Sequence, residues 1–453
     1  MPRKPRISFA ASEEQKGGRR TIGLGVIGVG TVGTGTVRVF TEHQREIERR
    51  LGCRLELKHI CSRSILKRKD LGWLGRDVKR TRDWREVLRD PGVDIAVELV
   101  GEPGTALTIA RATLEARKHL VTANKLLVAE HGRELDERSG RARVNLGIEA
   151  CVAGGTPVLT AIREGLAGEH FRELYGILNG TTNYILTEME RRGCSFSEAL
   201  AEAQAQGYAE PDPTLDVEGH DARYKIAILS MLCFGRAVRV SDIPAEGITR
   251  IEQVDFAYAH KLHRTIRLIA SAQRLTSERL SIAVRPMMIP GEAQLAGVRG
   301  PTNGILLVGS KGGNTLITGR GAGGEATGVA ILSDVVEIAR TILAGGSSTS
   351  PLGYTHWHEG KMATPGDVTT GAYLRLVVRD RPGILSRVCS ILARFGINID
   401  SVLQEPGHSK NRLPFVMTLE PTTERRISQA AAAIRRLPFL AKPPLIMPFA
   451  ELP

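Results

Sequence analysis

Short apolar runs alternate with amphipathic stretches over residues 21–150. The runs IGLGVIGV (22–29), LELKHIC (55–61) and VDIAVELV (93–100) are mostly apolar, and the stretch 32–50 has the apolar spacing of a helix. Strands without a polar face that alternate with helices are typical of a parallel sheet covered on both sides. Residues 21–150 are therefore predicted to form an α/β domain around a parallel sheet.

A different pattern begins at residue 151, where helical spacing mixes with strand-like runs. Helices are predicted at 157–166, 183–206 and 219–235, and strands at 171–178, 279–289 and 303–319. We therefore expect a domain of the α+β class over residues 151–325. The run LITGR and the helix that follows it, at 326–344, are expected to pack back onto the first domain.

Both ends of the chain differ from these two domains. Gly, Ser, Thr and Pro dominate residues 345–371, a composition typical of a linker. Residues 372–453 follow the order strand, helix, strand, strand, helix, strand, which predicts a ferredoxin-like βαββαβ module. Residues 1–20 are basic and contain glycine, so we expect a flexible tail.

Composition narrows the class of protein. The 453 residues are 42% hydrophobic and 25% charged, which is typical of a globular protein with several cores. No apolar run approaches the roughly 18 residues that span a bilayer, so we expect no membrane partner. The six cysteines form no CxxC pair, which favours free thiols and a cytoplasmic location.

The net charge of +13 raises the question of nucleic acid. Lys and Arg are spread along the whole chain, aromatic residues make up only 4%, and no nucleic-acid-binding motif is present. We therefore expect no nucleic-acid partner. A basic surface that attracts anionic metabolites and phosphorylated cofactors explains the charge equally well.

A glycine-rich turn follows the first predicted strand and opens the first predicted helix. Its sequence, GVGTVG, fits the pattern GxGxxG, in which glycines permit a tight turn and let the backbone approach a pyrophosphate at the helix N-terminus. A turn without a ligand is the alternative, but the strand–turn–helix context favours a dinucleotide in a Rossmann-type domain. The predicted cofactor contacts are Gly28, Val29, Gly30, Thr31, Val32 and Gly33.

The loop after the second strand distinguishes between cofactors. A carboxylate there would bind the ribose of NAD(H), whereas cations suit the additional phosphate of NADP(H). The loop offers Arg63 and then Lys67, Arg68 and Lys69. NADP(H) is therefore favoured, with Arg63 and Lys67 as contacts, while NAD(H) stays open. A solvated basic loop without a ligand is the alternative.

Residues 210–221 reverse the charge of the chain locally. The carboxylates in these positions are Glu210, Asp212, Asp216, Glu218 and Asp221. Like charges repel, so such a cluster indicates a cation among them, and the spacing does not fit an EF-hand loop. The ammonium group of a small-molecule substrate would serve as that cation.

The helix after this segment carries a lysine on its apolar side. Asp221 and Lys225 are four residues apart and share one helix face, which continues into Ile228, Leu229 and Leu232. A lysine on a stripe that leads into the core is unusual, so it is expected to be paired with Asp221 or to act in a cleft. A structural ion pair at the surface is the alternative.

At these residues the chain resembles the homoserine dehydrogenase family. The resemblance covers roughly residues 21–345 and is strongest over 207–229 (GYAEPDPTLDVEGHDARYKIAIL). It implies an NAD(P)-dependent enzyme that interconverts L-aspartate 4-semialdehyde and L-homoserine, with a catalytic and dimerisation role for residues 151–325. Further similar segments are the GxGxxG turn, VTANK (121–125), EACVAGGTP (149–157), LNGTTN (178–183) and GRGAG (319–323).

The resemblance implies a role for each residue of the site. Lys225 would donate or relay a proton to the carbonyl oxygen, and Asp221 would orient it. Glu210 and Asp216 would bind the substrate. Lys125 would lie near both nicotinamide and substrate, although its place at the start of a predicted helix also fits a surface lysine.

Some positions depart from the family pattern. Glu102 follows Gly101, the cofactor contact expected on the nicotinamide side, where the family commonly has a second glycine. Residues 302–304 (TNG) replace a stretch that usually contains an aromatic residue, and residues 325–327 (EAT) replace a turn with proline. These departures put cofactor contacts in doubt and leave the Asp221–Lys225 pair untouched.

Two further ligands follow from the resemblance. The turn after the first domain resembles the family's monovalent-cation loop, in which carbonyls of Glu149, Val152, Gly154 and Thr156 would bind Na⁺ or K⁺ in a structural role. The C-terminal module resembles an ACT domain through VRDRPGIL (378–385) and Asn398. This implies threonine as an effector, with dimerisation alone as the alternative. The family also implies a homo-oligomer.

Two other classes of function compete with this interpretation. A thiol-dependent semialdehyde dehydrogenase would use Cys151, but no motif places a histidine to activate it. A non-catalytic sensor would combine dinucleotide and amino-acid binding without turnover. Oxidation of NADPH in the presence of aspartate semialdehyde distinguishes the sensor from an enzyme.

Overall fold

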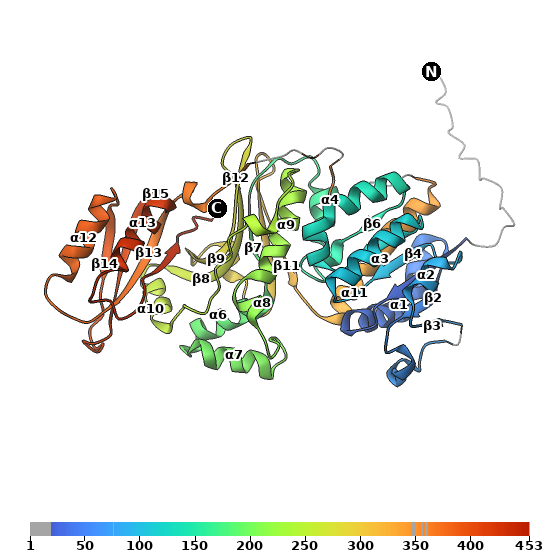
Figure 1. Ribbon diagram of the computed structural model, residues 1–453, viewed down its shortest axis with the longest axis horizontal. Coiled ribbons are helices and arrows are strands. Elements are labelled where there is room, and N and C mark those ends of the chain that lie inside the picture. The colour runs from blue at the N-terminus through green and yellow to red at the C-terminus, as the bar shows by residue number, and fades with distance from the viewer. Residues whose placement is uncertain (1–19, 76, 347–349, 355–356, 358–360, 453) are drawn as a thin grey trace, which may run out of the picture.

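The computed structural model describes residues 20–75, 77–346, 350–354, 357 and 361–452. Its three sheets follow one another along the long axis of the molecule, in the order of the sequence (Figure 1). Of the predicted N-terminal tail, residues 1–19 lie outside the described residues. No described helix is long and apolar enough to cross a membrane. All six cysteines are free thiols.

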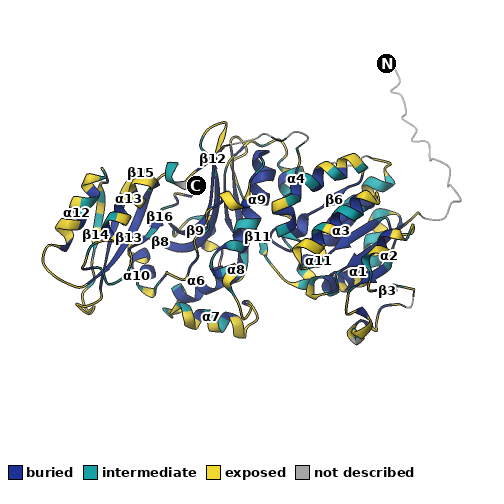
Figure 2. Ribbon diagram, in the orientation of Figure 1, coloured by how far each residue is buried: buried dark blue, intermediate teal, exposed yellow. Residues whose placement is uncertain are grey.

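The first sheet is parallel and has the strand order β3-β2-β1-β4-β5-β6. This confirms the predicted Rossmann-type sheet, whose central strands are buried while the edge strand β3 and the outer faces of the surrounding helices are exposed (Figure 2). The strands are β1 Thr21–Ile27, β2 Arg54–Cys61, β3 Lys79–Thr81, β4 Ile95–Glu98, β5 His119–Thr122 and β6 Leu146–Gly147. The helices between them are α1 Thr31–Leu51, α2 Trp84–Arg89, α3 Pro103–Glu115 and α4 Lys125–Ala142.

A helix from much later in the chain completes this domain. Helix α11 (Gly324–Leu343), orange in Figure 1, packs along α1. The two backbones cross closely, because a Cβ atom at Gly35 would lie 2.3 Å from the carbonyl carbon of Gly324. The run Leu316–Arg320, expected to accompany this helix, instead pairs with β10 of the second sheet.

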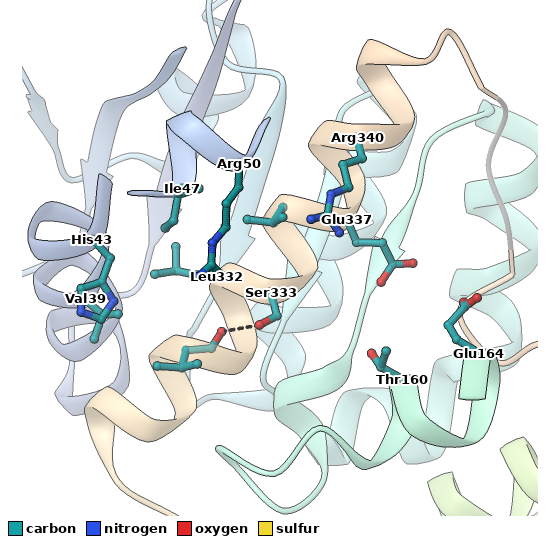
Figure 3. A pocket seen from close by; sticks show the side chains of 12 residues that line it. Val39, His43, Ile47, Arg50, Thr160, Glu164, Leu332, Ser333, Glu337 and Arg340 are labelled. Atoms are coloured by element: carbon teal, nitrogen blue, oxygen red, sulfur yellow. Dashed lines mark hydrogen bonds between the residues drawn. The ribbon is translucent and has the colours of Figure 1, made fainter. Parts of the chain in front are cut away.

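The other end of the α1–α11 contact opens into a groove of about 580 Å³. Figure 3 shows Ile47 and Arg50 of α1 facing Leu332 and Arg340 of α11 across it, with Thr160 at the far side. None of the site residues predicted from the sequence lines this groove.

The second sheet is mixed and has the order β11-β10-β7-β8-β9-β12. Its strands are β7 Phe171–Ile177, β8 Arg264–Arg274, β9 Arg279–Pro290, β10 Thr302–Gly309, β11 Asn314–Arg320 and β12 Lys361–Ala363. Its helices are α5 Val158–Thr160, α6 Gly180–Arg192, α7 Phe196–Ala205, α8 Thr214–Val217, α9 His220–Phe234 and α10 Gln253–Lys261. A π-helical turn, Ala161–Gly165, follows α5.

Three sequence predictions for this domain need correction. The helix expected at 183–206 is two helices, because Gly193 ends α6 in the left-handed region (φ 65°) and Ser195 starts α7 with a capping box to Glu198. The strand expected at 303–319 is the hairpin β10–β11. Strand β8 and helix α10 were not predicted.

The third sheet has the order β14-β15-β13-β16 and confirms the βαββαβ prediction. Its elements are β13 Thr369–Val378, α12 Ile384–Arg394, β14 Ile399–Leu403, β15 Leu413–Thr423, α13 Glu424–Ile434 and β16 Leu445–Pro448. Within the predicted linker, the described residues include β12, which pairs with β9.

The third sheet is joined to α10 of the second domain by buried polar contacts. The Tyr373 hydroxyl donates to Asp255 Oδ1 (2.7 Å), and Arg375 forms ion pairs with Asp255 Oδ2 (3.1 Å) and Glu252 (3.0 Å). Asp255 is fully buried, and burial raises the pKa of its carboxyl while Arg375 opposes that change. The C-terminal module is therefore seated on the second domain rather than hanging from a linker.

Candidate active site

Two lysines meet at one buried carboxylate. Lys225 Nζ lies 2.7 Å from Asp221 Oδ2, and Lys125 Nζ lies 2.7 Å from Asp221 Oδ1. Asp221 and Lys225 share a face of α9, whereas Lys125 is the first residue of α4 in the first domain. The predicted pair is thus joined by the third residue implied by the family resemblance, at the junction of two domains.

Charge balance in this group is set by the two lysines. Burial alone would raise the pKa of the Asp221 carboxyl, but the positive charges of Lys225 and Lys125 outweigh it and hold the pKa well below its usual range. Burial likewise opposes the charge of Lys125, and Asp221 more than compensates, so the pKa of Lys125 is raised. Asp221 is therefore a permanent anion between two cations.

Within the described part of the chain, Lys225 Nζ donates to two groups, which leaves its third N–H without a described acceptor. An ammonium group has three donors. One goes to Asp221, and a second goes to the backbone carbonyl of Leu178 (2.8 Å). That carbonyl also accepts from the side-chain amide of Asn303 (3.2 Å), a fully buried residue of β10. Two of the three donors of Lys225 are thus fixed by buried groups.

Asn179 organises the acidic side of the site and was quoted from the sequence only as part of a motif. Its Nδ2 donates to Asp216 Oδ1 (2.6 Å) and to Asp221 Oδ2 (3.0 Å), while its Oδ1 caps α6 by accepting from Thr182 N (2.8 Å). Burial, followed by the charge of Asp221, raises the pKa of Asp216. An Asn that opens a helix after a buried strand is a capping signal that could have identified it.

Glu210, the remaining predicted substrate contact, lies apart from the buried group around Asp221. Glu210 is exposed, in the loop between α7 and α8, and its carbonyl accepts from the side chain of Gln204 (3.1 Å). Its carboxylate takes part in no described contact with Lys225 or Asp221. The structure therefore brings Asp216, Asp221 and Lys225 together and leaves Glu210 at the edge.

The glycine-rich turn has the geometry that a dinucleotide requires. Gly28 has φ 101°, and a Cβ there would lie 2.4 Å from the Leu99 carbonyl oxygen. A Cβ at Gly33 would lie 2.0 Å from the Gly28 carbonyl oxygen, and Gly30 is the N-cap of α1 with open space around it. Only glycine fits at positions 28 and 33, while Gly30 leaves room for a ligand at the helix N-terminus. Of the other predicted contacts, Val29 is buried and Thr31 and Val32 begin α1.

The basic loop after β2 divides into two parts. Arg63 and Lys67 are exposed, as the predicted phosphate contacts should be. Arg68 instead lies across the glycine turn, where it donates to the Val29 carbonyl and to the Thr34 hydroxyl (3.0 Å) and pairs with Asp70 (2.6 Å). Arg68 therefore places a cation directly against the glycine turn.

A cavity of about 720 Å³ borders the glycine turn, and three arginines line it. They are Arg38 of α1, Arg68 and Arg320, and the cavity is also lined by Ala322 and Gly323 of the GRGAG segment and by Gly324, the first residue of α11. Arg38 forms an ion pair with Glu325 (3.1 Å), one of the residues that replace the family's proline-containing turn. Arg38 and Arg320 were not singled out from the sequence, and Arg320 reaches the glycine turn from a strand much later in the chain.

The nicotinamide side is shaped by Glu102 and by Asn124. Glu102, which departs from the family pattern, caps α3 by accepting from Gly104 N (2.9 Å) and Thr105 N (2.7 Å). Gly101 before it is exposed. Asn124, the residue before Lys125, caps α4 and donates to the Val100 carbonyl (3.3 Å). This hydrogen bond joins the loop after β4 to the start of α4.

The turn from Glu149 to Thr156 fits a cation held by carbonyl groups. Ala153 (φ 56°) and Gly154 (φ 49°) are both left-handed, and within the described part of the chain the carbonyls of Val152 and Gly154 accept no hydrogen bond. The Glu149 carboxylate is occupied, because it accepts from Leu159 N (3.0 Å) and Thr160 N (2.7 Å). Uncommitted carbonyl oxygens are the ligands that hard cations take, so the carbonyls of Val152 and Gly154 suit this role. The other two predicted carbonyls are engaged, because Glu149 O accepts from Val152 N (3.4 Å) and Thr156 O from Val158 N (2.8 Å).

Cys151 does not have the environment of a nucleophile. The thiol is buried and donates to the Thr122 carbonyl (3.3 Å), and burial raises its pKa well above the usual value. A catalytic cysteine needs an exposed thiolate. The thiol-dependent alternative is therefore disfavoured.

Comparison with known proteins identifies the family. Residues 28–149 match the family model of the homoserine dehydrogenase NAD binding domain, residues 157–336 that of homoserine dehydrogenase, and residues 372–439 that of the ACT domain. Homoserine dehydrogenase of Neisseria gonorrhoeae is 36% identical over 427 residues, which cover 94% of this chain and 97% of that protein. The chain belongs to the homoserine dehydrogenase family.

Other relatives agree with this assignment. Homoserine dehydrogenase of Pseudomonas aeruginosa is 36% identical over 94% of this chain and 98% of its own length. Among solved structures, a homoserine dehydrogenase from Thiobacillus denitrificans has a TM-score of 0.88 at 35% identity and covers 96% of this chain and 99% of that chain. A family member from S. aureus gives a TM-score of 0.75 at 28% identity, with coverage of 95% and 99%.

Membership in the homoserine dehydrogenase family makes this chain an oxidoreductase with an NAD-binding domain and a C-terminal ACT domain. The glycine turn belongs to the first of these, and the Asp221–Lys225 pair to the segment that matches the catalytic model. Residues 150–156, which include part of the turn predicted to bind a cation, lie between these two matched segments.

Proposed function

We propose that this chain interconverts L-aspartate 4-semialdehyde and L-homoserine with NADP(H), as a step in the biosynthesis of threonine, methionine and isoleucine. One observation carries the proposal: a buried carboxylate, Asp221, holds Lys225 of the second domain and Lys125 of the first domain within 2.7 Å each. A lysine fixed in this way at a domain junction suits proton transfer to a carbonyl oxygen. Family membership supports the substrate pair.

The bound nicotinamide supplies a hydride to the carbonyl carbon, and the protein handles the proton. Lys225 donates its third N–H to the carbonyl oxygen and releases that proton as the alkoxide forms. Asp221 and the Leu178 carbonyl hold the remaining two donors, so the amine stays aimed at the same point. Lys125 adds positive charge beside the developing negative oxygen, and in the reverse direction Lys225 accepts the proton of the homoserine hydroxyl.

The acidic side of the site would bind the amino group of either substrate. Asp216 is held by Asn179, and its carboxylate faces the same group of side chains as Asp221. An ammonium group next to Asp216 would supply the cation that the acidic segment lacks. Glu210 at the rim would then contact the substrate only if the loop that carries it closes over the site.

The preference for NADP(H) over NAD(H) rests on the arginines. The pyrophosphate would lie at the N-terminus of α1 beside Arg68, and the phosphate on the ribose would meet Arg63 and Lys67 in the exposed loop after β2. No carboxylate occupies the position where NAD-specific proteins bind the ribose hydroxyl. A monovalent cation on the carbonyls of Glu149, Val152, Gly154 and Thr156 would stabilise the junction between the two domains.

Threonine is the proposed effector of the ACT domain. The start of α12, with Gly383 as its N-cap (φ 88°), would hold the carboxylate of the amino acid. Asn398, directly before β14, is the second residue proposed to contact it. Asn398 now donates to Glu420 (3.0 Å) on the neighbouring strand. Asn398→Ala should raise the threonine concentration needed for half inhibition while leaving the uninhibited rate within twofold.

The protein is further proposed to form a homo-oligomer and to act in the cytoplasm, where six free thiols are stable. The decisive experiment adds aspartate semialdehyde to the protein with NADPH in one assay and with NADH in another. The absorbance of the reduced cofactor is followed in each. Rapid oxidation that depends on the semialdehyde is expected. Binding of NADPH without turnover would favour the non-catalytic sensor instead.

A further inference from the structure

A buried glutamate at the end of β4 has no positive partner among the described residues. Glu98 is 0% exposed. Its Oε1 accepts from the backbone N–H of Val100 (2.6 Å) and its Oε2 from the hydroxyl of Thr122 (2.7 Å). Both donors are uncharged, so a negative charge on this carboxyl would be buried without compensation.

The groups around Glu98 do not supply the missing charge. Cys151, which donates to the Thr122 carbonyl, is a neutral thiol. Lys125 is paired with Asp221. Asp334 accepts from Glu149 N (2.9 Å), and burial raises the pKa of its carboxyl well above the usual value. The two groups bonded to Glu98 are therefore neutral, and the other charged groups that act on the nearby Cys151 are acidic or already paired.

The end of β4, where Glu98 lies, is where a nicotinamide ring would be expected, and this step rests on the proposed function. In a sheet of this strand order a dinucleotide lies across the carboxyl ends of the strands, with its nicotinamide half beyond the first glycine turn. Glu98 ends β4, Thr122 ends the adjacent strand β5, and Lys125 follows Thr122 by three residues. A ring that passes a hydride to a carbonyl held by Lys225 must lie over these two strand ends.

We propose that Glu98 is the counter-charge of the oxidised nicotinamide ring, ionised beneath the oxidised ring and protonated beneath the reduced one. The oxidised ring is a cation, and the two electrons and one proton of a hydride make it neutral. As the new C–H bond forms on the ring, the Glu98 carboxylate loses its only positive partner and takes up a proton from solvent, forming an O–H bond. Oxidation of the cofactor reverses both changes.

The carboxyl is suited to this exchange near neutral pH. Burial raises the pKa of Glu98 to about 7, against the hydrogen bonds from Thr122 and Val100, which lower it. A nearby positive ring lowers that pKa, so binding of NADP⁺ at pH 7 releases a proton. Affinity for NADP⁺ should therefore rise as pH increases through about 7, whereas affinity for NADPH gains nothing from this group.

The test compares the two redox states of the cofactor in Glu98→Gln, which keeps the shape of the side chain and removes its charge. Dissociation constants for NADP⁺ and NADPH are measured by direct titration between pH 6 and pH 8. NADP⁺ should bind about tenfold more weakly at pH 8, and NADPH should change by less than about twofold. The pH dependence of NADP⁺ binding should flatten.

Asp136→Asn is the matched control. Asp136 is also a buried acid, and burial raises its pKa to about 6, but it bonds to Ser350 and lies eleven residues along α4 from Lys125, about 16 Å away at 1.5 Å per residue. Its substitution should leave the ratio of the two dissociation constants unchanged. A change equal to that of Glu98→Gln would show that any buried acid has this effect.

Two outcomes overturn the proposal. Equal weakening of NADP⁺ and NADPH in Glu98→Gln would mean that Glu98 only holds the loops of Val100 and Thr122 in place. Calorimetry of the wild-type protein in two buffers of different ionisation enthalpy counts the protons directly and needs no variant, and binding of NADP⁺ at pH 7 without proton release would also refute it. If neither cofactor binds the wild-type protein, the proposed function itself fails.

Discussion

At the scale of single residues, the site depends on how the donors of one lysine are used. Asp221 and the Leu178 carbonyl occupy two of the three N–H groups of Lys225, and Asn303 and Asn179 hold those acceptors in turn. Truncation of Lys225 would remove the proton donor but leave the glycine turn of the first domain intact. Chemistry and cofactor binding should therefore separate.

Lys225→Ala should reduce kcat by about 10² to 10⁴, the range for loss of a general acid, while the dissociation constant for NADPH stays within a few-fold. Steady-state kinetics and titration of NADPH fluorescence measure the two quantities. Lys118→Ala is the control, since Lys118 is also buried but donates to the carbonyls of Asp90 and Val93 instead. Normal turnover in Lys225→Ala would remove this lysine from the mechanism.

The two arginines near the cofactor should have different effects. Arg63→Ala should weaken NADPH binding by about 10- to 100-fold and NADH binding little, because one charge-assisted contact to a phosphate contributes on the order of 1.5 to 3 kcal/mol. Arg68→Ala should weaken both cofactors to a similar degree, because Arg68 lies on the glycine turn itself. Competitive titrations with both cofactors measure this. Equal losses in Arg63→Ala would refute the phosphate assignment.

At the scale of elements, the dinucleotide domain is completed by a helix from the far side of the second domain. Helix α11 packs on α1 through glycines, and the same glycines border the cofactor cavity. A Cβ at Gly35 would lie 2.3 to 2.8 Å from backbone atoms of Gly324 and Glu325. Neither backbone can move without displacing a helix.

Gly35→Ala should therefore destabilise the protein by about 1 to 3 kcal/mol, the usual cost of overpacking, although alanine is the better helix former. Gly140→Ala in the exposed end of α4, where nothing lies within 4 Å, is the matched control and should be neutral or stabilising by up to about 1 kcal/mol. Urea unfolding measures both. Equal stability of the two variants would contradict the close crossing of α1 and α11.

At the scale of the whole molecule, the ACT domain is fixed to the enzyme by a buried charge pair. Asp255 of α10 is met by Tyr373 and Arg375 of β13, so the ACT sheet and the catalytic domain share a polar contact inside a common core. Removal of the ACT domain would take away Tyr373 and Arg375 and leave the Asp255 carboxyl without these partners. Point variants are consequently a cleaner way to test communication between the domains than truncation.

Arg375→Met should lower stability by about 3 to 5 kcal/mol, because it leaves the Asp255 carboxyl buried without its cation. The double variant Asp255→Asn with Arg375→Met should recover much of that loss, since no unpaired charge is left. Urea unfolding with two probes, one in each domain, tests both energy and cooperativity. A loss below about 1 kcal/mol in the single variant would mean that the pair is solvated.

Much of the architecture follows from local patterns. The alternation of apolar runs with helical spacing predicted the parallel sheet, and the βαββαβ order predicted the third sheet, because burial of both faces or one face leaves a period in the sequence. Strand β8 escaped prediction although its centre is buried. Its eleven residues include Arg264, Arg267 and Arg274, and the ion pair between Arg267 and Glu190 that makes this burial tolerable joins residues far apart in the chain.

The sequence by itself determined the chemistry that each segment can offer: a glycine turn for phosphate, a lysine four residues from an aspartate, and an acidic segment in a basic chain. Only the tertiary structure decided which of these groups meet. Lys125 reaches Asp221 across a domain junction, Arg320 and Gly324 line the cavity at the glycine turn, and Glu98 is buried with only Val100 N and the Thr122 hydroxyl as partners among the residues that the structure describes. These are contacts between residues far apart in the chain, set by how whole sheets and helices pack, and no local spacing encodes them.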